Sequence, residues 1–264
     1  NNTEAMCLFK TTSDAHLEEV FDAGAETNVP DDVKWAGLDE SQRTAVKRLY
    51  AWIRSCVPDG ATSADLSTFK SEKFRDEISD YFDKAFLLTY YLWTDYFLAV
   101  DQRAKNMMLR TWDGLIWYIT YYDGDTQMGK RNDCFLVYDY TTDRDTYDAE
   151  AGKYAFEGRD SWLWNLVLAN LDADLKTQAQ ALRGVLTTSR VLDMLNVEQA
   201  GNWCDRAYNK SGELKYILPA TQEMYGKVWP FIYALQGSNR AHREYFVRNR
   251  FALLDAKYGT SNFT

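Results

Sequence analysis

Residues 100–129 read VDQRAKNMMLRTWDGLIWYITYYDGDTQMG, and the middle of this stretch predicts a β-hairpin. Aromatic, branched and other apolar side chains dominate residues 107–112 and 115–122, as is typical of strands. Asp113 and Gly114 stand between the two runs, and both residue types tolerate the positive φ of a two-residue hairpin turn. We therefore expect two antiparallel strands, Met107–Trp112 and Leu115–Tyr122, joined at Asp113-Gly114.

Polar and charged side chains flank this predicted hairpin on both sides. They are Asp101, Arg103, Lys105 and Asn106 before it, and Asp123 and Asp125 after it. Because the two ends of a hairpin meet, we expect the two groups to face one another. Protein kinases need such a set: an Asp that accepts the proton of the attacking hydroxyl, a basic residue that offsets phosphate charge, and an Asn and a second Asp that hold Mg²⁺. The alternative is structural, with Asp101 bonding backbone N–H groups at a turn and both later acids in a solvated or Lys/Arg-paired turn.

The chain before the hairpin predicts one strand and two helices. Ala5–Phe9 is a short apolar run that favours a strand, and it suggests that residue 1 is a cut or processed end. Apolar residues at helical spacing follow Asp39, a candidate N-cap, and the helix should end at Pro58-Asp59-Gly60. A second helix should start at about residue 72 or 80 and end at Val100. Its few polar positions predict a buried, central helix.

The chain after the hairpin is predicted to be mostly helical. Residues 134–138 favour one more short strand, and residues 139–160 are acidic and loop-like. From Ser161 onward the pattern indicates four or five helices, the last running from Ser238 to Gly259. With no internal repeat and no clear linker, we expect one domain over residues 1–264. Its fold class should be α+β, a small hairpin-containing sheet followed by a helical bundle.

Composition argues against several classes of function. The 264 residues include 30 Lys and Arg against 39 Asp and Glu, a net charge of -9, whereas duplex-binding domains usually carry a basic surface. The longest apolar run, Ala85–Val100, is interrupted by Thr89, Thr94 and Asp95 and falls short of the ~20 residues of a membrane helix. Four cysteines without a CxxC pair and two histidines favour reduced thiols over a zinc site. We therefore expect no nucleic-acid and no membrane partner.

Aromatic and basic residues near the C-terminus have structural interpretations. We expect Trp162, Trp164 and Trp203 to lie in the core rather than to form a sugar-binding platform. Four arginines crowd the last predicted helix: Arg240, Arg243, Arg248 and Arg250. They favour a solvated face paired with acids such as Glu244 and Asp255 over a phosphate-binding site.

Three segments resemble a known family. VDQRAKNMML (100–109), WDGLIWYITYYDGDTQMG (112–129) and RNRFALLDAKYG (248–259) are similar to the CotH-type spore-coat kinase family. They are closer still to large virion or tail proteins of tailed bacteriophages that carry a domain of that type. The resemblance implies a protein-kinase-like large lobe over residues 71–264, preceded by an N-terminal part, residues 1–70.

The resemblance also implies roles for the flanking polar residues. Asp101 would be the catalytic-loop acid, with Arg103 and Lys105 near the phosphates, while Asn106, Asp123 and Asp125 would hold the metal. Residues 1–70 depart from a complete kinase, because they contain no glycine-rich phosphate loop and no apolar strand with a central Lys. A small lobe therefore either precedes residue 1 in a longer protein or is lost.

Three functions follow as hypotheses. The favoured one is a structural component of a phage virion, in the tail or baseplate, with a degenerate kinase-like domain (a pseudokinase). Such a protein would assemble in the host cytoplasm as a homo-oligomer with other virion subunits. The alternative is an active CotH-type Ser/Thr protein kinase that uses Mg and ATP, with Asp101 as base. A third is a module that binds a protein or glycan through exposed aromatic rings.

Overall fold

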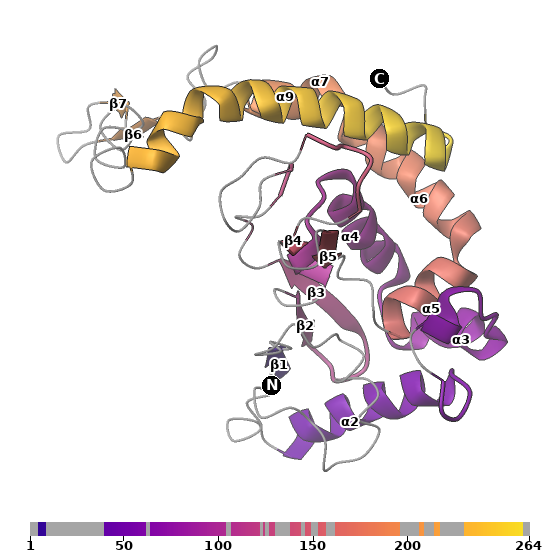
Figure 1. Cartoon of the computed structure of the whole chain (residues 1–264). Helices are drawn as coiled ribbons and strands as arrows, with labels where there is room; N and C mark the ends of the chain where they lie inside the picture. The colour runs from indigo at the N-terminus through magenta and orange to yellow at the C-terminus, as the bar shows by residue number, and fades with distance from the viewer. Residues whose placement is uncertain are drawn as a thin grey trace.

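A computed structural model places the predicted hairpin and helices in an α+β architecture (Figure 1). It describes residues 5–8, 40–61, 64–103, 107–121, 124, 127–129, 138–143, 146–148, 153–156, 162–195, 206–208, 214–216 and 230–260. Within these residues the sheets are one antiparallel sheet of three strands and two ribbons of two strands. The helices surround the larger sheet and supply most of the core.

The larger sheet confirms the predicted first strand and the predicted hairpin. Its strands are β1 (Ala5–Leu8), β2 (Met107–Thr111) and β3 (Trp117–Tyr121), in the order β1-β2-β3. Side chains alternate along β2 and β3, so Leu109 and Ile119 are buried on one face. The register pairs Met107 with Tyr121, so the two open ends of the hairpin lie next to each other.

The turn of this hairpin differs from the prediction. Strand pairing ends at Thr111 and Trp117, which leaves a five-residue loop, 112–116, instead of a two-residue turn. Asp113 causes the difference, because its Oδ1 accepts the backbone N–H groups of Leu115 at 2.8 Å and Ile116 at 2.9 Å. These bonds take the place of strand pairing. Gly114 has the positive φ expected of it, +74°.

Among the described residues before the hairpin, the α-helices are α2 (Glu40–Ser55), α3 (Glu72–Glu77) and α4 (Lys84–Tyr96). The first confirms the prediction. The second predicted helix is divided, because a 3₁₀ turn, Ile78–Asp80, follows α3 and Asp83 starts α4 afresh by accepting the Phe86 N–H at 2.9 Å. Helix α4 is buried at the centre, as predicted.

Helix α4 ends at Tyr96 rather than at Val100. Leu98 adopts a φ of 49°, a left-handed conformation that stops an α-helix. A 3₁₀ helix, Val100–Arg103, then leads toward β2. The segment that carries Asp101 is therefore short, and it is attached directly to the buried end of α4.

After the hairpin come α5 (Trp162–Asn170), α6 (Asp172–Val185), α7 (Thr188–Leu195) and α9 (Pro230–Tyr258). Trp162 and Trp164 are buried, as predicted, whereas Trp203 lies outside the described residues. The last helix starts at Pro230 rather than at Ser238. Proline is well suited to a first helical turn, where its missing N–H has no intrahelical partner.

Helix α9 ends where the sequence predicts. Gly259 has a φ of +73°, and the Thr260 N–H returns to the Asp255 carbonyl at 2.8 Å. This is a Schellman cap, which satisfies carbonyls that the last turn would leave without partners.

Two short ribbons were not predicted. One joins β4 (Thr146–Asp148) to β5 (Lys153–Phe156) inside the predicted loop, and the other joins β6 (Arg206–Tyr208) to β7 (Leu214–Tyr216) inside the predicted helical region. Strands of three or four residues are too short to show the period of two on which strand prediction depends. The strand expected at residues 134–138 falls, except for Tyr138, outside the described residues.

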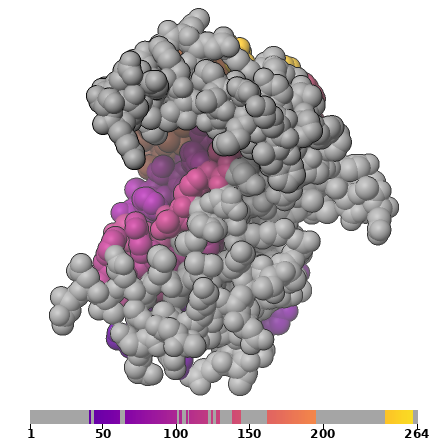
Figure 2. Space-filling model, turned by 90° about the vertical axis from the view of Figure 1, so that its left-hand side faces the viewer, coloured from indigo at the N-terminus to yellow at the C-terminus, as the bar shows by residue number. Residues whose placement is uncertain are grey.

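The core runs through the molecule with α4 at its centre. Helices α6 and α9 pack on α4, as does β3, and α2 lies at the opposite end of the molecule from α9 (Figure 1). On one face, residues of the β2–β3 region reach the surface as a continuous stripe, pink in Figure 2. Within the described part of the chain, no helix combines the length and apolarity that crossing a bilayer requires.

Candidate functional site

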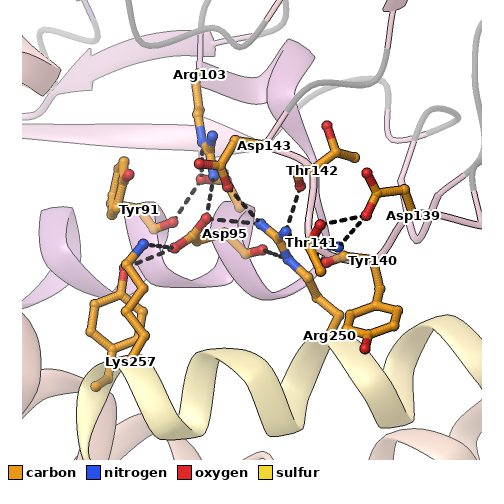
Figure 3. A network of polar contacts seen from close by, with 12 residues as sticks. Tyr91, Asp95, Arg103, Asp139, Tyr140, Thr141, Thr142, Asp143, Arg250 and Lys257 are labelled. Carbon is orange, nitrogen blue, oxygen red and sulfur yellow. Dashed lines mark hydrogen bonds and ion pairs between the residues drawn. The ribbon is translucent and has the colours of Figure 1, made fainter. Parts of the chain in front are cut away.

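Three cationic side chains and a phenol surround the carboxylate of Asp95 (Figure 3). Asp95 lies in the last turn of α4 and has no exposed surface. Its Oδ1 accepts from Nη2 of both Arg103 and Arg250, at 3.1 Å each. Its Oδ2 accepts from Lys257 Nζ at 3.0 Å and from the Tyr258 hydroxyl at 2.8 Å. Arg103 and Arg250 are fully buried, whereas the Lys257 side chain is 45% exposed.

These contacts keep Asp95 ionised. Burial on its own would raise the pKa of the Asp95 carboxyl, but the charges of Arg103, Lys257 and Arg250 outweigh it, and the Tyr258 hydrogen bond adds to them. The net result is a pKa well below the usual range for an aspartate. A carboxylate with this many partners acts as a structural anion rather than as a proton acceptor near neutral pH.

Arg103 is held in the core from two helices. Its Nε donates to Thr94 Oγ1 on α4 at 2.8 Å, and its guanidinium lies 5.1 Å from the centre of the Tyr91 ring. Its carbonyl accepts from Trp164 Nε1 on α5 at 2.8 Å. These bonds anchor the 3₁₀ helix Val100–Arg103 on the inner side of the molecule.

Arg250 connects α9, the end of α4 and the loop at residues 138–143. Its Nε donates to the Asp95 carbonyl at 3.0 Å, and Nη1 donates to the carbonyls of Tyr140 and Thr142 at 3.0 and 2.5 Å. Its Nη2 also pairs with Asp143 at 3.2 Å. One buried guanidinium therefore holds three separate segments together (Figure 3).

This arrangement corrects the expected solvated arginine face of α9. Arg250 lies one turn from the buried residues Phe246 and Leu254, so the helix period places it on the inner stripe. Asp255, expected to pair on the surface, is buried and bound by Arg183 of α6 at 2.8 and 2.9 Å. Arg248 is exposed and Arg243 half-buried, while the Arg240 side chain lies outside the described set.

Most of the predicted catalytic and metal residues are not tested. The backbone of Asp101 lies in the 3₁₀ helix Val100–Arg103, but its side chain is outside the described set. The remaining four also lie outside the described residues: Lys105, Asn106, Asp123 and Asp125. Arg103 alone has a described side chain, and it points into the core. The assignment of these residues stays a prediction.

Described residues next to the predicted site residues show where the ends of the hairpin lie. The pairing of Met107 with Tyr121 sets the two open ends of the hairpin side by side. Farther along the chain, the Met128 N–H donates to the Phe97 carbonyl at 2.6 Å. That bond returns the chain to the end of α4, close in sequence to Asp101.

The described part of the chain holds no group of three His, Cys, Asp or Glu side chains placed to bind a metal ion. Cys56 is free and buried, as predicted for a reduced thiol. Burial raises the pKa of the Cys56 thiol to about 12, so it stays protonated and unreactive.

Sequence reasoning missed the Asp95 cluster, although the sequence carried a signal for it. Asp95 interrupts the apolar run Ala85–Val100, and a carboxylate inside a buried helix must find cationic partners. The partners Arg250 and Lys257 are far along the chain, so a single sequence does not identify them.

In comparisons with known proteins, no protein-family model, curated protein or solved structure matches the chain.

Proposed function

We propose that this chain is a structural subunit of a bacteriophage virion, in the tail or baseplate, with a kinase-like but degenerate domain. The observation that supports degeneracy most directly is the burial of Arg103. The resemblance puts this residue near the phosphates, yet its guanidinium neutralises Asp95 in the core. Reaching a nucleotide would break that pair, and leaving one partner of a buried pair alone costs about 3–5 kcal/mol.

The chain order supports the kinase-like part of the proposal. A buried helix, α4, leads into the short segment with Asp101 and then into the β2–β3 hairpin, and Asp123 and Asp125 follow the hairpin in the sequence. This is the order that the resembling segments imply for a kinase large lobe. A fold outlives its chemistry readily, so this order is compatible with a domain that no longer transfers phosphate.

The buried ion pairs suit a subunit with a structural role. Asp95 and Arg250 join α4 to α9, and Arg183 and Asp255 join α6 to α9. All four side chains are buried and within hydrogen-bond distance of their partners. Another packing of these helices would leave a buried charge without its partner, so few alternative arrangements are available. The assignment to a virion rests on the resemblance of segments 100–109, 112–129 and 248–259.

A second candidate is an active Mg-ATP-dependent Ser/Thr protein kinase. It is favoured by the pairing of Met107 with Tyr121 and by the Met128–Phe97 hydrogen bond. The first sets Met107 beside Tyr121, and the second brings Met128 to the end of α4. A kinase would need Asp101, Asn106, Asp123 and Asp125 to converge there.

Thermal unfolding with Mg-ATP separates the two candidates. If the Kd for Mg-ATP is one-hundredth of the added concentration, binding raises the free energy of unfolding by about 2.7 kcal/mol. The structural proposal predicts no rise in Tm at millimolar Mg-ATP, using the whole protein with any residues that precede Asn1. A rise in Tm that the variants Asp123→Asn and Asp125→Asn abolish would overturn the hypothesis that the domain is degenerate. Incorporation of labelled phosphate into a peptide would establish kinase activity.

A further inference from the structure

The tip of the β2–β3 hairpin presents a prominent aromatic ring. Trp112 is 44% exposed, in the five-residue loop 112–116. The Arg110 guanidinium lies over its ring, 4.8 Å from the ring centre, which limits the positions that the ring can take. An exposed tryptophan stacked against an arginine has the composition of a protein–protein hot spot.

Leu115 and Ile116 of the same loop line a depression of about 550 Å³. Its lining consists of Arg48, Glu77, Ser79, Asp80, Tyr81, Leu115 and Ile116. Leu115 is 51% exposed, so part of this lining is apolar surface in contact with water. The hairpin tip therefore carries both a projecting ring and a recess.

The recess has a rigid, planar wall. The Arg48 guanidinium donates to the carbonyls of Leu115 at 2.8 Å and Asp80 at 3.0 Å, and it lies 4.1 Å from the centre of the Tyr81 ring. Tyr81 in turn stacks on Trp52, with ring centres 4.2 Å apart and planes 9° apart. A guanidinium fixed in this way is a good stacking surface for a further aromatic ring.

The recess offers a carboxylate of opposite charge to the cation beside the exposed Trp112 ring, while the cation in its lining, Arg48, is engaged by the carbonyls of Leu115 and Asp80. Glu77 and Asp80 line the recess, and Glu77 is paired with Lys73 at 2.9 Å. For the exposed Asp80 carboxylate, the described segments contain no ion-pair partner. An aromatic ring accompanied by a cation fits this lining, and Trp112 with Arg110 is such a group.

We propose that two copies of this chain associate through their hairpin tips, each inserting Trp112 into the recess of the other. Such an exchange is self-complementary, because a twofold axis makes every contact occur twice. Arg110 of each copy then faces Asp80 of the other. A hairpin tip offers less than the ~800 Å² per partner of a stable interface, so the dimer is weak and forms with rising concentration. This inference does not rest on the virion role.

Sedimentation equilibrium of the whole chain over a range of concentrations tests the association. We expect a concentration-dependent dimer that Trp112→Ser weakens by about tenfold or more. The matched control is Met194→Ser, which removes a 64% exposed apolar side chain from α7 and leaves the dimer unchanged. A chain that stays monomeric throughout overturns the proposal, as does a dimer that Trp112→Ser leaves intact.

A charge exchange locates the contact. Arg110→Glu alone puts two acids together, and Asp80→Arg alone puts two cations together, so each single variant weakens the dimer. The double variant restores an attractive pair and binds more tightly than either single variant. Because Asp80 is exposed and Arg110 only partly buried, all three variants should keep the wild-type Tm. A double variant no tighter than the single variants overturns the pairing of Arg110 with Asp80.

Discussion

Asp95 and Arg250 contact each other twice, although 155 positions separate them along the chain. Arg250 Nη2 donates to the Asp95 carboxylate at 3.1 Å, and Arg250 Nε donates to the Asp95 carbonyl at 3.0 Å. The two bonds join the end of α4 to α9, and both residues are buried. The stability of the domain should therefore depend on this pair more than on any surface ion pair.

Replacing Asp95 should destabilise the fold severely. Asp95→Asn keeps the shape of the side chain but leaves two fully buried guanidinium groups without their shared anion. We expect the free energy of unfolding to fall by about 3–5 kcal/mol, measured by urea denaturation. Asp76→Asn is the matched control, because Asp76 is exposed and its ion pair with Arg75, at 3.5 Å, lies on the surface. A loss below about 1 kcal/mol would show that the network contributes no more than a surface pair.

The same carboxylate should shape the response to acid. Burial raises the pKa of Asp95, but the three cations lower it further, so the folded-state pKa lies below the 3.8 of a free aspartate. Its contribution to stability is therefore complete above about pH 5 and is lost as the pH falls through 3.8 toward the folded value. The difference in unfolding free energy between wild type and Asp95→Asn should be constant near neutrality and shrink below pH 4. A difference that grows on acidification contradicts this sign.

Loop 138–143 should open when Arg250 is shortened. Arg250→Lys keeps the positive charge but cannot reach Asp95, Tyr140 and Thr142 together, because an ammonium lacks the planar fork of a guanidinium. We expect faster amide hydrogen exchange in residues 138–143 with little change in α2. Arg248→Lys, two positions away and exposed, should leave exchange in the loop unchanged. Equal exchange in all three proteins would mean that Arg250 does not hold the loop.

The hairpin loop should depend on one carboxylate. Asp113 Oδ1 accepts two backbone N–H groups and the Thr111 hydroxyl, and the bond from Ile116 is the main cause of a lowered Asp113 pKa. Asp113→Ala should cost about 0.5–2 kcal/mol, as the loss of a helix cap does. Asp113→Asn retains an acceptor oxygen, so it should lower the free energy of unfolding by less. Denaturation of wild type and both variants in guanidinium chloride measures the difference. Identical midpoints for wild type, Asp113→Ala and Asp113→Asn would exclude the carboxylate as the organiser of the loop.

Local patterns predicted the parts of the fold that local interactions control. The hairpin, the buried helix α4 and the end of α9 at Gly259 each have signals within a few residues. The predicted two-residue turn is wrong because hydrogen bonds to the Asp113 side chain replace backbone pairing between the strands. Ribbons β4–β5 and β6–β7 were missed because each strand is shorter than a detectable pattern.

The polar core could not be predicted in the same way. Arg250 has the sequence context of a surface arginine, and only its position on the stripe with Phe246 and Leu254 indicates burial. Its partner Asp95 belongs to a different helix, so the pair exists only in the folded chain. The opposite holds for the predicted catalytic site. The sequence gives a chemical reason to group Asp101, Asn106, Asp123 and Asp125, but their side chains lie outside the described set, so the site stays a prediction.

Quantitative peptide mass spectrometry of phage particles, purified from cultures in which this chain is expressed, tests the proposed structural role most directly. A structural role predicts that peptides of this chain co-purify with intact particles in several copies per particle. It also predicts that they survive a wash in high salt, as integral tail components do. Peptides abundant in the infected-cell lysate but missing from purified particles would contradict the structural role and favour a protein that acts outside the virion.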